Sequence, residues 1–153
     1  MTPAIALLKK QKISFELLSY KHDTSNSHYG QEAVEKLNLK SEQVYKTLVL
    51  ETYENELIVA ITPVSQQVNL KKLAKLCRTK KVAMAAAQKV QASTGYILGG
   101  VSPLGQKKRL QTFIHHSALQ FTHIYVSAGK RGLEVMLKTA DLTLLTNASF
   151  EDF

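Results

Sequence analysis

The sequence predicts one α+β domain in which helices flank a mixed β-barrel or curved sheet. The chain has 153 residues, the usual size of a domain with one hydrophobic core. Runs rich in β-branched and aromatic residues alternate with short helical patterns, and they lie at hairpin distance or one short helix apart. No internal repeat or linker interrupts this order. We therefore treat residues 1–153 as a single domain whose strand order is left open.

The N-terminal part predicts a helix, a strand and a second helix. Thr2 is a suitable N-cap and Pro3 a suitable first helical residue, and an apolar stripe follows them. Residues 13–20, ISFELLSY, are rich in β-formers and predict a strand. The polar run 21–30 predicts a loop, and the pattern of 31–39 predicts a short helix.

A hairpin is the clearest signal further along the chain. Runs 44–53 and 56–63 are both rich in β-formers, and they flank the turn residues Glu54 and Asn55. The remaining elements are predicted from runs of β-formers, which indicate strands, and from helical apolar patterns with their caps, which indicate helices. These are a helix over 70–77 capped by Asn69, a strand over 80–85, a helix over 86–94 ending near Gly95, strands over 110–116, 123–127 and 133–138, and a helix over 140–147 capped by Thr139.

Charge is distributed unevenly along the chain, whose formal net charge is +8. All twelve carboxylate side chains lie at or before Glu56 or at or after Glu134, whereas residues 57–133 hold twelve Lys and Arg. A positive field attracts polyanions, and we favour a nucleic-acid partner over a merely skewed, solvated surface. Two-metal and paired-carboxylate chemistry needs Asp or Glu, so this central block cannot supply it.

Targeting and redox signals point to a cytoplasmic protein with no place in a membrane. No apolar run reaches the roughly 18 residues that a membrane span needs, and the N-terminus lacks the features of a signal peptide. Cys77 is the only cysteine, so no internal disulfide can form. We expect a reducing compartment.

A lysine interrupts an apolar strand pattern. The alternating residues that share its strand face are Val44, Lys46, Leu48 and Leu50. An ammonium that points into a lined cavity must meet an anion or a carbonyl there, because burying it unpaired is costly. A lysine near a strand end can also extend its ammonium into water. The pattern alone leaves both interpretations open.

Two glycine-containing loops lie beside basic residues. Residues 99–103, Gly-Gly-Val-Ser-Pro, offer backbone N–H groups without a nearby Cβ, and such groups can bind a carbonyl oxygen, a phosphate or a ribose. Residues 127–132, Ser-Ala-Gly-Lys-Arg-Gly, separate two predicted strands. Each loop can be a plain turn. Two basic loops in one small domain nevertheless favour a common site.

Metal and triad chemistry has no recognisable pattern here. The histidines at 115, 116 and 123 and the lone Cys77 lack the spacing of metal ligands, so we expect no metal and no cofactor. His22 and His28 flank the predicted loop, where we expect them to be solvated. No nucleophile elbow or Ser-His-Asp arrangement is present.

The longest motifs resemble the YbaK branch of the YbaK/ProX family, free-standing editing domains related to the insertion domain of bacterial prolyl-tRNA synthetase. The resemblance runs over nearly the whole chain, through MTPAIALLKKQKISFELLSY, VYKTLVL and NLKKLAK. It is densest in STGYILGGVSPLGQKKR and IYVSAGKRGLEV. It implies a mixed β-barrel flanked by helices.

The resemblance also implies an activity, the hydrolysis of Cys-tRNA(Pro), in which prolyl-tRNA synthetase has attached cysteine by mistake. In the implied mechanism the substrate thiol attacks the ester and leaves a cyclic thioester that opens later. The implied partners are the 3′ end of aminoacylated tRNA and prolyl-tRNA synthetase. Alternatives are an Ala-tRNA(Pro) or broader aminoacyl-tRNA deacylase, a non-catalytic module that binds aminoacyl-tRNA or nucleotide ends, and a generic basic nucleic-acid binder.

The same resemblance implies a set of site residues. Lys46 would bind a phosphate or the ester region of the terminal adenosine, and the N–H groups of Gly99 and Gly100 would hold the carbonyl or the ribose. Tyr20 and Tyr29 would wall the aminoacyl pocket. The other implied substrate-binding residues are Thr47, Val101, Ser102, Pro103, Ser127, Gly129 and Glu134. Tyr29 stands where the family usually has phenylalanine, and Glu134 where it usually has aspartate.

Overall fold

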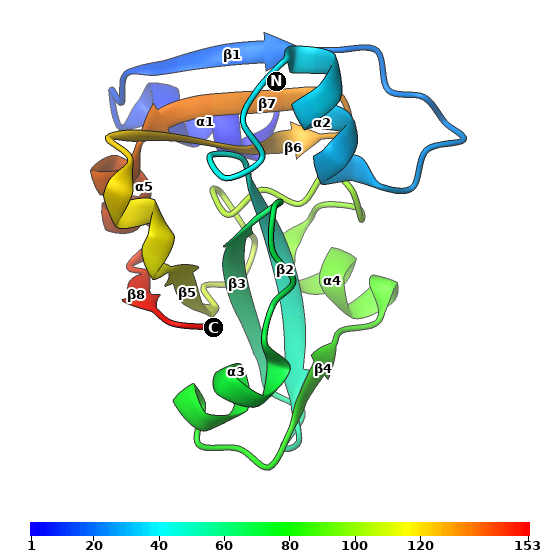
Figure 1. Cartoon of the computed structure of the whole chain (residues 1–153), viewed down its shortest axis with the longest axis vertical. Coiled ribbons are helices and arrows are strands. Elements are labelled where there is room, and N and C mark those ends of the chain that lie inside the picture. The colour runs from blue at the N-terminus through cyan, green and yellow to red at the C-terminus, as the bar shows by residue number, and fades with distance from the viewer.

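The chain folds into two β-sheets rather than one closed barrel, as a computed structural model of residues 1–153 shows (Figure 1). The strands are β1 (Phe15–Ser19), β2 (Tyr45–Thr52), β3 (Leu57–Pro63), β4 (Val82–Met84), β5 (Gln111–His115), β6 (His123–Lys130), β7 (Leu133–Lys138) and β8 (Ser149–Glu151). One sheet has the order β1-β7-β6, and the other has the order β4-β2-β3-β5-β8. The second sheet is mixed, because β3, β5 and β8 run parallel. The predicted mixed sheet is confirmed, whereas the barrel is not closed.

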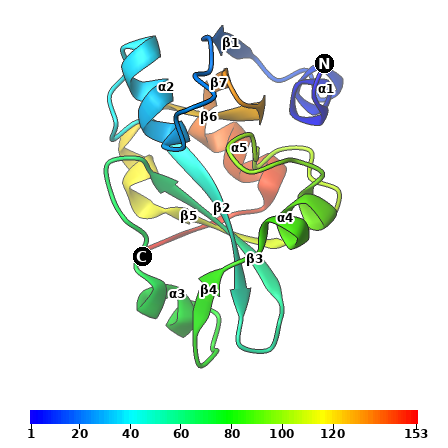
Figure 2. The same ribbon diagram turned by 90° about the vertical axis from the view of Figure 1, so that its right-hand side faces the viewer.

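Five α-helices and one short 3-10 helix connect the strands. They are α1 (Pro3–Lys10), α2 (Tyr29–Leu37), α3 (Leu70–Leu76), α4 (Ala87–Thr94), α5 (Thr139–Thr146) and the 3-10 helix η1 (His116–Gln120). Figures 1 and 2 place α1 and α3 at opposite ends of the molecule. No helix is both long and apolar enough to cross a bilayer.

The predicted helix caps are confirmed at two helices. Thr2 caps α1 by accepting a hydrogen bond from the N–H of Ile5 (3.2 Å), and Asn69 caps α3 by accepting one from the N–H of Lys72 (3.1 Å). The Thr2 hydroxyl also donates to the carbonyl of Ala128 on β6. This bond fixes the start of α1 against the three-stranded sheet.

The predicted hairpin is also confirmed. β2 and β3 pair antiparallel, with Lys46 opposite Thr62 and Glu51 opposite Leu57. Asn55 has a φ of 67°, a left-handed conformation that asparagine adopts more easily than most residues. The turn therefore follows directly from local sequence.

The end of the chain differs from the prediction in two ways. Thr139 is not the cap of α5; Lys138 occupies the N-cap position, and Thr139 is the first helical residue. The Thr139 hydroxyl instead donates to the carbonyl of Phe121 (2.7 Å), which ties the start of α5 to the segment before β6. In addition, β8 and η1 form where the sequence patterns predict no element.

The two faces of β2 belong to two hydrophobic clusters. Tyr45 and Val49 lie in the larger cluster of 20 buried residues, which includes side chains from α1, β6 and β7. Leu50 lies in a smaller cluster of 8 buried residues beneath α3, and Leu48 packs against it. Alternation along the strand thus directs successive side chains into different cores.

The two sheets meet at the N-terminal end of β2. Val44, directly before β2, forms a parallel bridge with Tyr125 of β6. Two hydrogen bonds support it, from the N–H of Tyr125 to the carbonyl of Gln43 (3.1 Å) and from the Gln43 side chain to the carbonyl of His123 (2.9 Å). The next residues of β2, including Lys46, are therefore held at the junction of the sheets.

Candidate active site

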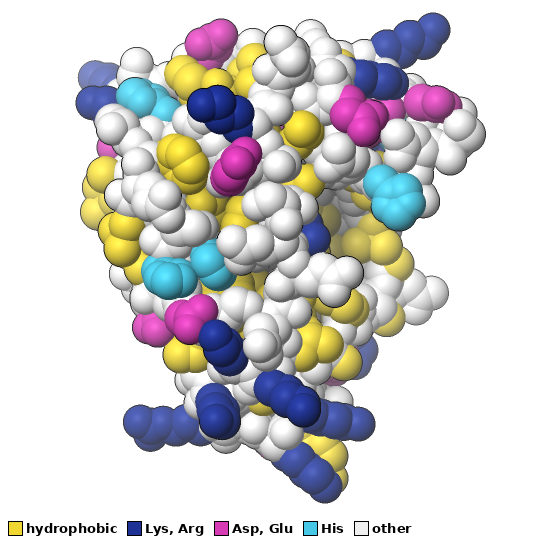
Figure 3. Space-filling view, viewed as in Figure 1, with side chains coloured by type: hydrophobic (Ala, Val, Ile, Leu, Met, Phe, Trp, Pro, Cys, Tyr) yellow, Lys and Arg dark blue, Asp and Glu magenta, His cyan; other side chains and the backbone are white.

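A cavity of about 420 Å³ opens at the junction of the sheets, beside the start of α2. Its lining comes from residues 27–31 around the start of α2, 44–49 of β2 and its approach, and Met84 and Ala85 around the end of β4, together with Val64, Val90, Leu98, Gly99, Val101, Ser127 and Glu134. Figure 3 shows a hollow on this side of the molecule, below α2, with hydrophobic side chains inside it. We refer to this cavity as the junction pocket.

Many of the residues implied by the sequence lie in the junction pocket, although they come from distant segments. Those that line it are Tyr29, Lys46, Thr47, Gly99, Val101, Ser127 and Glu134. The predicted loop over 127–132 is largely the end of β6, whose Ser127 reaches the pocket, and it contributes to the same cavity as the distant glycine loop. The lining is mostly apolar, and Lys46 is its only lysine or arginine.

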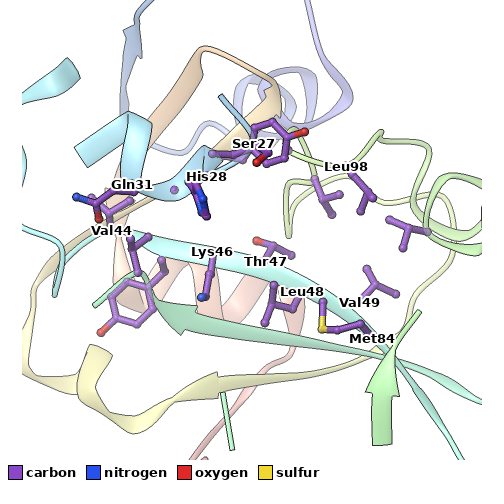
Figure 4. A pocket seen from close by; sticks show the side chains of 18 of the residues that line it. Ser27, His28, Gln31, Val44, Lys46, Thr47, Leu48, Val49, Met84 and Leu98 are labelled. Atoms are coloured by element: carbon purple, nitrogen blue, oxygen red, sulfur yellow. The ribbon is translucent and has the colours of Figure 1, made fainter. Parts of the chain in front are cut away.

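Lys46 carries an unpaired charge in this pocket. The side chain is half-buried, and it forms no ion pair or hydrogen bond with another residue. Burial lowers the pKa of its ammonium from the ordinary lysine value. Figure 4 shows Lys46 and Thr47 on opposite sides of the β2 ribbon, and the Thr47 hydroxyl is buried without a partner. The Lys46 ammonium is therefore available to a ligand.

Glu134 is the one buried carboxyl of the pocket. Its side chain lies on β7, opposite Ser127 of β6, and only 8% of the residue is exposed. Its Oε2 atom has no hydrogen-bond partner. Burial raises the pKa of this carboxyl to about 8, so the neutral form prevails at pH 7. An unpartnered polar atom of this kind indicates a place for a ligand atom.

The glycine loop is fixed against Tyr29 and the β6–β7 turn. Gly99 has a φ of +87°, and a Cβ there would lie 2.8 Å from the Tyr29 ring and 2.8 Å from Nε of Arg131. Arg131 Nε donates to the carbonyl of Leu98 (2.9 Å). A Cβ on Gly100 would lie 3.0 Å from the backbone of Lys130 and Arg131. Glycine is therefore required by close approach as well as by conformation.

The backbone N–H groups of this loop differ in availability. The N–H of Gly100 donates to the carbonyl of Ile97 (3.0 Å) and is occupied. The N–H groups of Gly99 and Val101 make no hydrogen bond within the chain. The donors that a ligand can use are thus those on either side of Gly100.

The other implied residues lie outside the lining of the junction pocket. Ser102 and Pro103 are buried beneath the loop, where the Ser102 hydroxyl accepts from the N–H of Leu104 (3.2 Å). Gly129 faces Tyr96 and Thr2. Tyr20 lines a separate polar hollow, and burial, together with the nearby carboxyls of Glu134 and Glu32, raises its pKa to about 12.

A buried carboxylate holds the segment that leads into the pocket. Glu32 of α2 accepts hydrogen bonds from the His22 ring (2.6 Å), the N–H of Asp23 (2.7 Å) and Lys36 (2.8 Å). Burial alone would raise the pKa of Glu32, but these bonds outweigh it and lower the pKa to about 2. The expectation of a solvated His22 is therefore wrong, since its ring is bound to Glu32.

Several lining residues carry no signal in the sequence. His28 and Ser27 border the pocket from the loop before α2, and Met84 and Leu98 do so from β4 and the glycine loop (Figure 4). Met84 is 54% exposed and Leu98 44% exposed, and both line the pocket. Isolated apolar residues are common in any sequence, so only the fold brings these two to one rim.

The pocket contains no assembled pair of protein nucleophile and base. The Ser127 hydroxyl accepts from the N–H of Gly129 (3.1 Å), and the Thr47 hydroxyl has no partner. Cys77, at the end of α3, packs against the smaller hydrophobic cluster, and burial raises the pKa of its thiol. The site offers one ammonium, one neutral carboxyl and free backbone donors in an apolar cavity. This set can bind and polarise an ester.

The fold is that of a class of small domains that edit aminoacylated tRNA. The chain belongs to the aminoacyl-tRNA editing domain family, whose sequence model matches residues 24–145. The family resemblance found in the motifs is thus confirmed.

Similar proteins agree with this assignment. EbsC of Enterococcus faecalis (strain ATCC 700802 / V583), named as a candidate Cys-tRNA(Pro)/Cys-tRNA(Cys) deacylase, is 37% identical over 152 residues, covering 99% of this chain and 92% of EbsC. Two solved structures share the fold at lower identity. A candidate trans-editing enzyme for prolyl-tRNA synthetase has a TM-score of 0.82 at 19% identity, covering 99% of this chain and 96% of that one. The hypothetical protein APE2540 has a TM-score of 0.87 at 20% identity, covering 99% and 98%.

Proposed function

We propose that the protein removes cysteine from mischarged Cys-tRNA(Pro) by cleaving the aminoacyl ester. The observation that carries this proposal is the junction pocket itself. The unpaired ammonium of Lys46 and the free N–H groups of the glycine loop share this cavity, which holds no assembled pair of protein nucleophile and base. A reaction in such a site depends on a reactive group of the substrate, and the cysteinyl group has one. The name of EbsC points to the same aminoacyl group.

The size of the junction pocket fits the end of the tRNA rather than a larger part of it. About 420 Å³ lies at the low end of the range of small-molecule sites, roughly 300–1,000 Å³. The cysteinyl group and the terminal ribose would occupy the interior. The half-exposed Met84 and Leu98 at the rim would contact the terminal adenine.

Two groups of the chain would orient the ester. Lys46 would bind a phosphate or ester oxygen, since its charge has no other partner. The free N–H groups of Gly99 and Val101 would hold the carbonyl oxygen as negative charge develops on it. This arrangement differs from the expectation that Gly100 donates, because the N–H of Gly100 is bound to Ile97.

The reaction would proceed in two steps. The substrate thiol loses its proton to water, and the sulfur attacks the ester carbonyl carbon. The carbon–oxygen bond to the ribose then breaks, and the ribose oxygen takes up a proton. The released cyclic thioester is opened by water, which restores the thiol and gives free cysteine. The protein contributes position and charge stabilisation in the first step.

Glu134 would meet the α-amino group of the cysteinyl ester. Its unpartnered oxygen is buried in the wall of the pocket, and no other carboxyl lines the cavity. A substrate ammonium beside it would favour the ionised carboxylate, and the resulting pair would fix the amino acid relative to the glycine loop.

Prolyl-tRNA synthetase is the proposed source of tRNA selectivity. A chain of 153 residues has little surface with which to read a whole tRNA. Association with the synthetase would deliver the mischarged product before it leaves for the ribosome. A pull-down of purified prolyl-tRNA synthetase by this purified protein, in the presence of charged tRNA, would test this association directly.

The test of the activity is deacylation of matched Cys-, Ala-, Ser- and Pro-tRNA(Pro) by the purified chain, with a metal chelator present. We expect rapid release of cysteine and no release of proline. Faster release of alanine than of cysteine would assign the protein to Ala-tRNA(Pro) instead. No release from any of the four would contradict the enzyme and favour a non-catalytic binding module.

A further inference from the structure

One end of the molecule carries a cluster of exposed positive charge. Six exposed cations surround α3 and the segment that leads into β4: Lys71, Lys72, Lys75, Arg78, Lys80 and Lys81. Figure 3 shows Lys and Arg side chains gathered there, at the end opposite to α1. We call this surface the α3 basic end.

Few carboxylates neutralise the α3 basic end. Of its cations only Lys72 makes an ion pair, with Asp152 (2.8 Å). On the adjoining β2–β3 turn are Glu54 and Glu56, and Glu54 accepts from the hydroxyl of Thr79 rather than from a cation. Six cations minus these three carboxylates leave a net charge of +3. A surface of this kind attracts phosphate backbones.

The strands link this surface to the junction pocket. β2 runs from Lys46 in the pocket to Thr52, which pairs with Val82 of β4. Val82 directly follows Lys81, a residue of the α3 basic end. Six residues of extended strand span roughly 20 Å. β4 then leads back from Lys81 to Met84 at the pocket rim. A ligand that fills the pocket and extends along β4 would reach the basic end.

We infer that the α3 basic end binds the phosphates of the acceptor stem while the junction pocket holds the aminoacyl group. A stacked strand rises about 3.4 Å per nucleotide along its axis, so roughly 20 Å corresponds to about six nucleotides. That distance takes the strand past the unpaired CCA end and into the start of the stem. The inference rests on the proposed function, because it takes the pocket occupant to be a charged tRNA.

A matched pair of triple variants isolates this surface. Lys71→Ala/Lys75→Ala/Arg78→Gly removes three cations from α3, where Arg78 follows the helix in a left-handed conformation (φ 54°). Lys9→Ala/Lys10→Ala/Lys12→Gly removes the same number from α1, where Lys12 has a φ of 57°. Both variants replace two helical lysines and one left-handed cation, and glycine relieves the backbone at the last position.

Binding of uncharged tRNA(Pro) transcript, followed by fluorescence anisotropy, is the direct measurement. We expect the α3 variant to bind about tenfold more weakly at low salt and its log Kd to depend less steeply on log salt by about 2. The α1 variant should match the wild type. Equal affinities of the two variants would overturn the inference. Retained tRNA affinity with weakened binding of purified prolyl-tRNA synthetase would overturn it in favour of a protein partner.

Deacylation provides a second readout that separates this inference from the proposed function. With Cys-tRNA(Pro), the α3 variant should show a KM about tenfold higher and an unchanged kcat. With a cysteinylated CCA trinucleotide, too short to reach α3, it should equal the wild type. A wild-type protein that deacylates no tRNA would contradict the proposed function, while the anisotropy experiment would still decide the role of the surface.

Discussion

The guanidinium of Arg131 lies over the ring of Tyr29, with its central carbon 4.8 Å from the ring centroid. The same side chain donates to the carbonyl of Leu98, so the start of α2, the glycine loop and the β6–β7 turn form one contact. Gly99 lies against both side chains, since a Cβ there would meet each of them at 2.8 Å. Three segments far apart in the sequence therefore fix the position of the loop that faces the pocket.

A substitution of Gly99 should disturb this contact. In Gly99→Ala the new Cβ would meet the Tyr29 ring at 2.8 Å in a left-handed backbone conformation. We expect a loss of about 2 kcal/mol of unfolding free energy and a fall of at least tenfold in kcat/KM for Cys-tRNA(Pro). Gly95→Ala is the control, because Gly95 has a similar φ of +84° but its nearest neighbour is the flexible Lys107 at 3.4 Å. It should lose about 1 kcal/mol and keep its activity; equal activities of the two variants would contradict the role of the loop.

Removal of the Lys46 charge should abolish most activity without unfolding the protein. Lys46→Met retains an aliphatic side chain of similar length but no ammonium. We expect kcat/KM to fall about 100-fold, the value of a charge-assisted hydrogen bond. Thermal unfolding should be unchanged or shifted upward, because the variant no longer buries an unpaired charge. Unchanged turnover of Cys-tRNA(Pro) by this variant would remove Lys46 from the mechanism.

The nature of the nucleophile can be tested with the substrate alone. Ser-tRNA(Pro) differs from Cys-tRNA(Pro) by one oxygen in place of sulfur, and a hydroxyl ionises far less readily than a thiol. Single-turnover deacylation of the serine ester should be at least roughly 100-fold slower at saturating protein. Equal rates for the two esters would rule out attack by the substrate thiol.

Glu134 should make the stability of the protein depend on pH. Its folded pKa of about 8 lies above the ordinary value of 4.5, so the folded state binds a proton that the unfolded state has released. The wild type should therefore lose up to a few kcal/mol of unfolding free energy as the pH rises from 4.5 to 8. In Glu134→Gln this loss disappears, and the variant should exceed the wild type in stability at pH 8.5.

Urea unfolding at pH 5, 7 and 8.5 measures this effect. Glu16→Gln, at an exposed position on β1 of the same sheet, is the control and should follow the wild-type curve. If Glu134→Gln and the wild type differed by a constant amount at all three pH values, the burial of a neutral carboxyl would be contradicted.

Local signals in the sequence predict much of this fold. The β2–β3 hairpin follows from alternation around Glu54 and Asn55, and the caps at Thr2 and Asn69 follow from side chains that satisfy their own helices. In contrast, β8 has only three residues and joins the sheet by parallel pairing with β5. Such pairing depends on contacts between residues far apart in the sequence rather than on a turn, so no local sequence pattern predicts β8.

Some residues of the candidate site can likewise be predicted from the sequence, whereas others are recognised only in the fold. The lysine in VYKTLVL and the glycines of the loop stand out because their residue types contradict their surroundings or relax the backbone. Met84 and Leu98 contradict nothing locally and become informative only when the fold leaves them half-exposed at one rim. Likewise, only the fold shows that the N–H of Gly100 is bonded to the carbonyl of Ile97, whereas the N–H groups of Gly99 and Val101 are free.

The pairing of β1 with β7 sets the order in which the nascent protein can mature. Leu17 pairs with Val135, so more than a hundred residues must leave the ribosome before β1 finds its neighbour. Until then β1 has no partner strand, and the wall that carries Glu134 does not exist. Contacts of such long sequence separation form slowly. A chain that has not yet reached β7 therefore lacks a working pocket, and catalytic competence arrives only after that strand has been made.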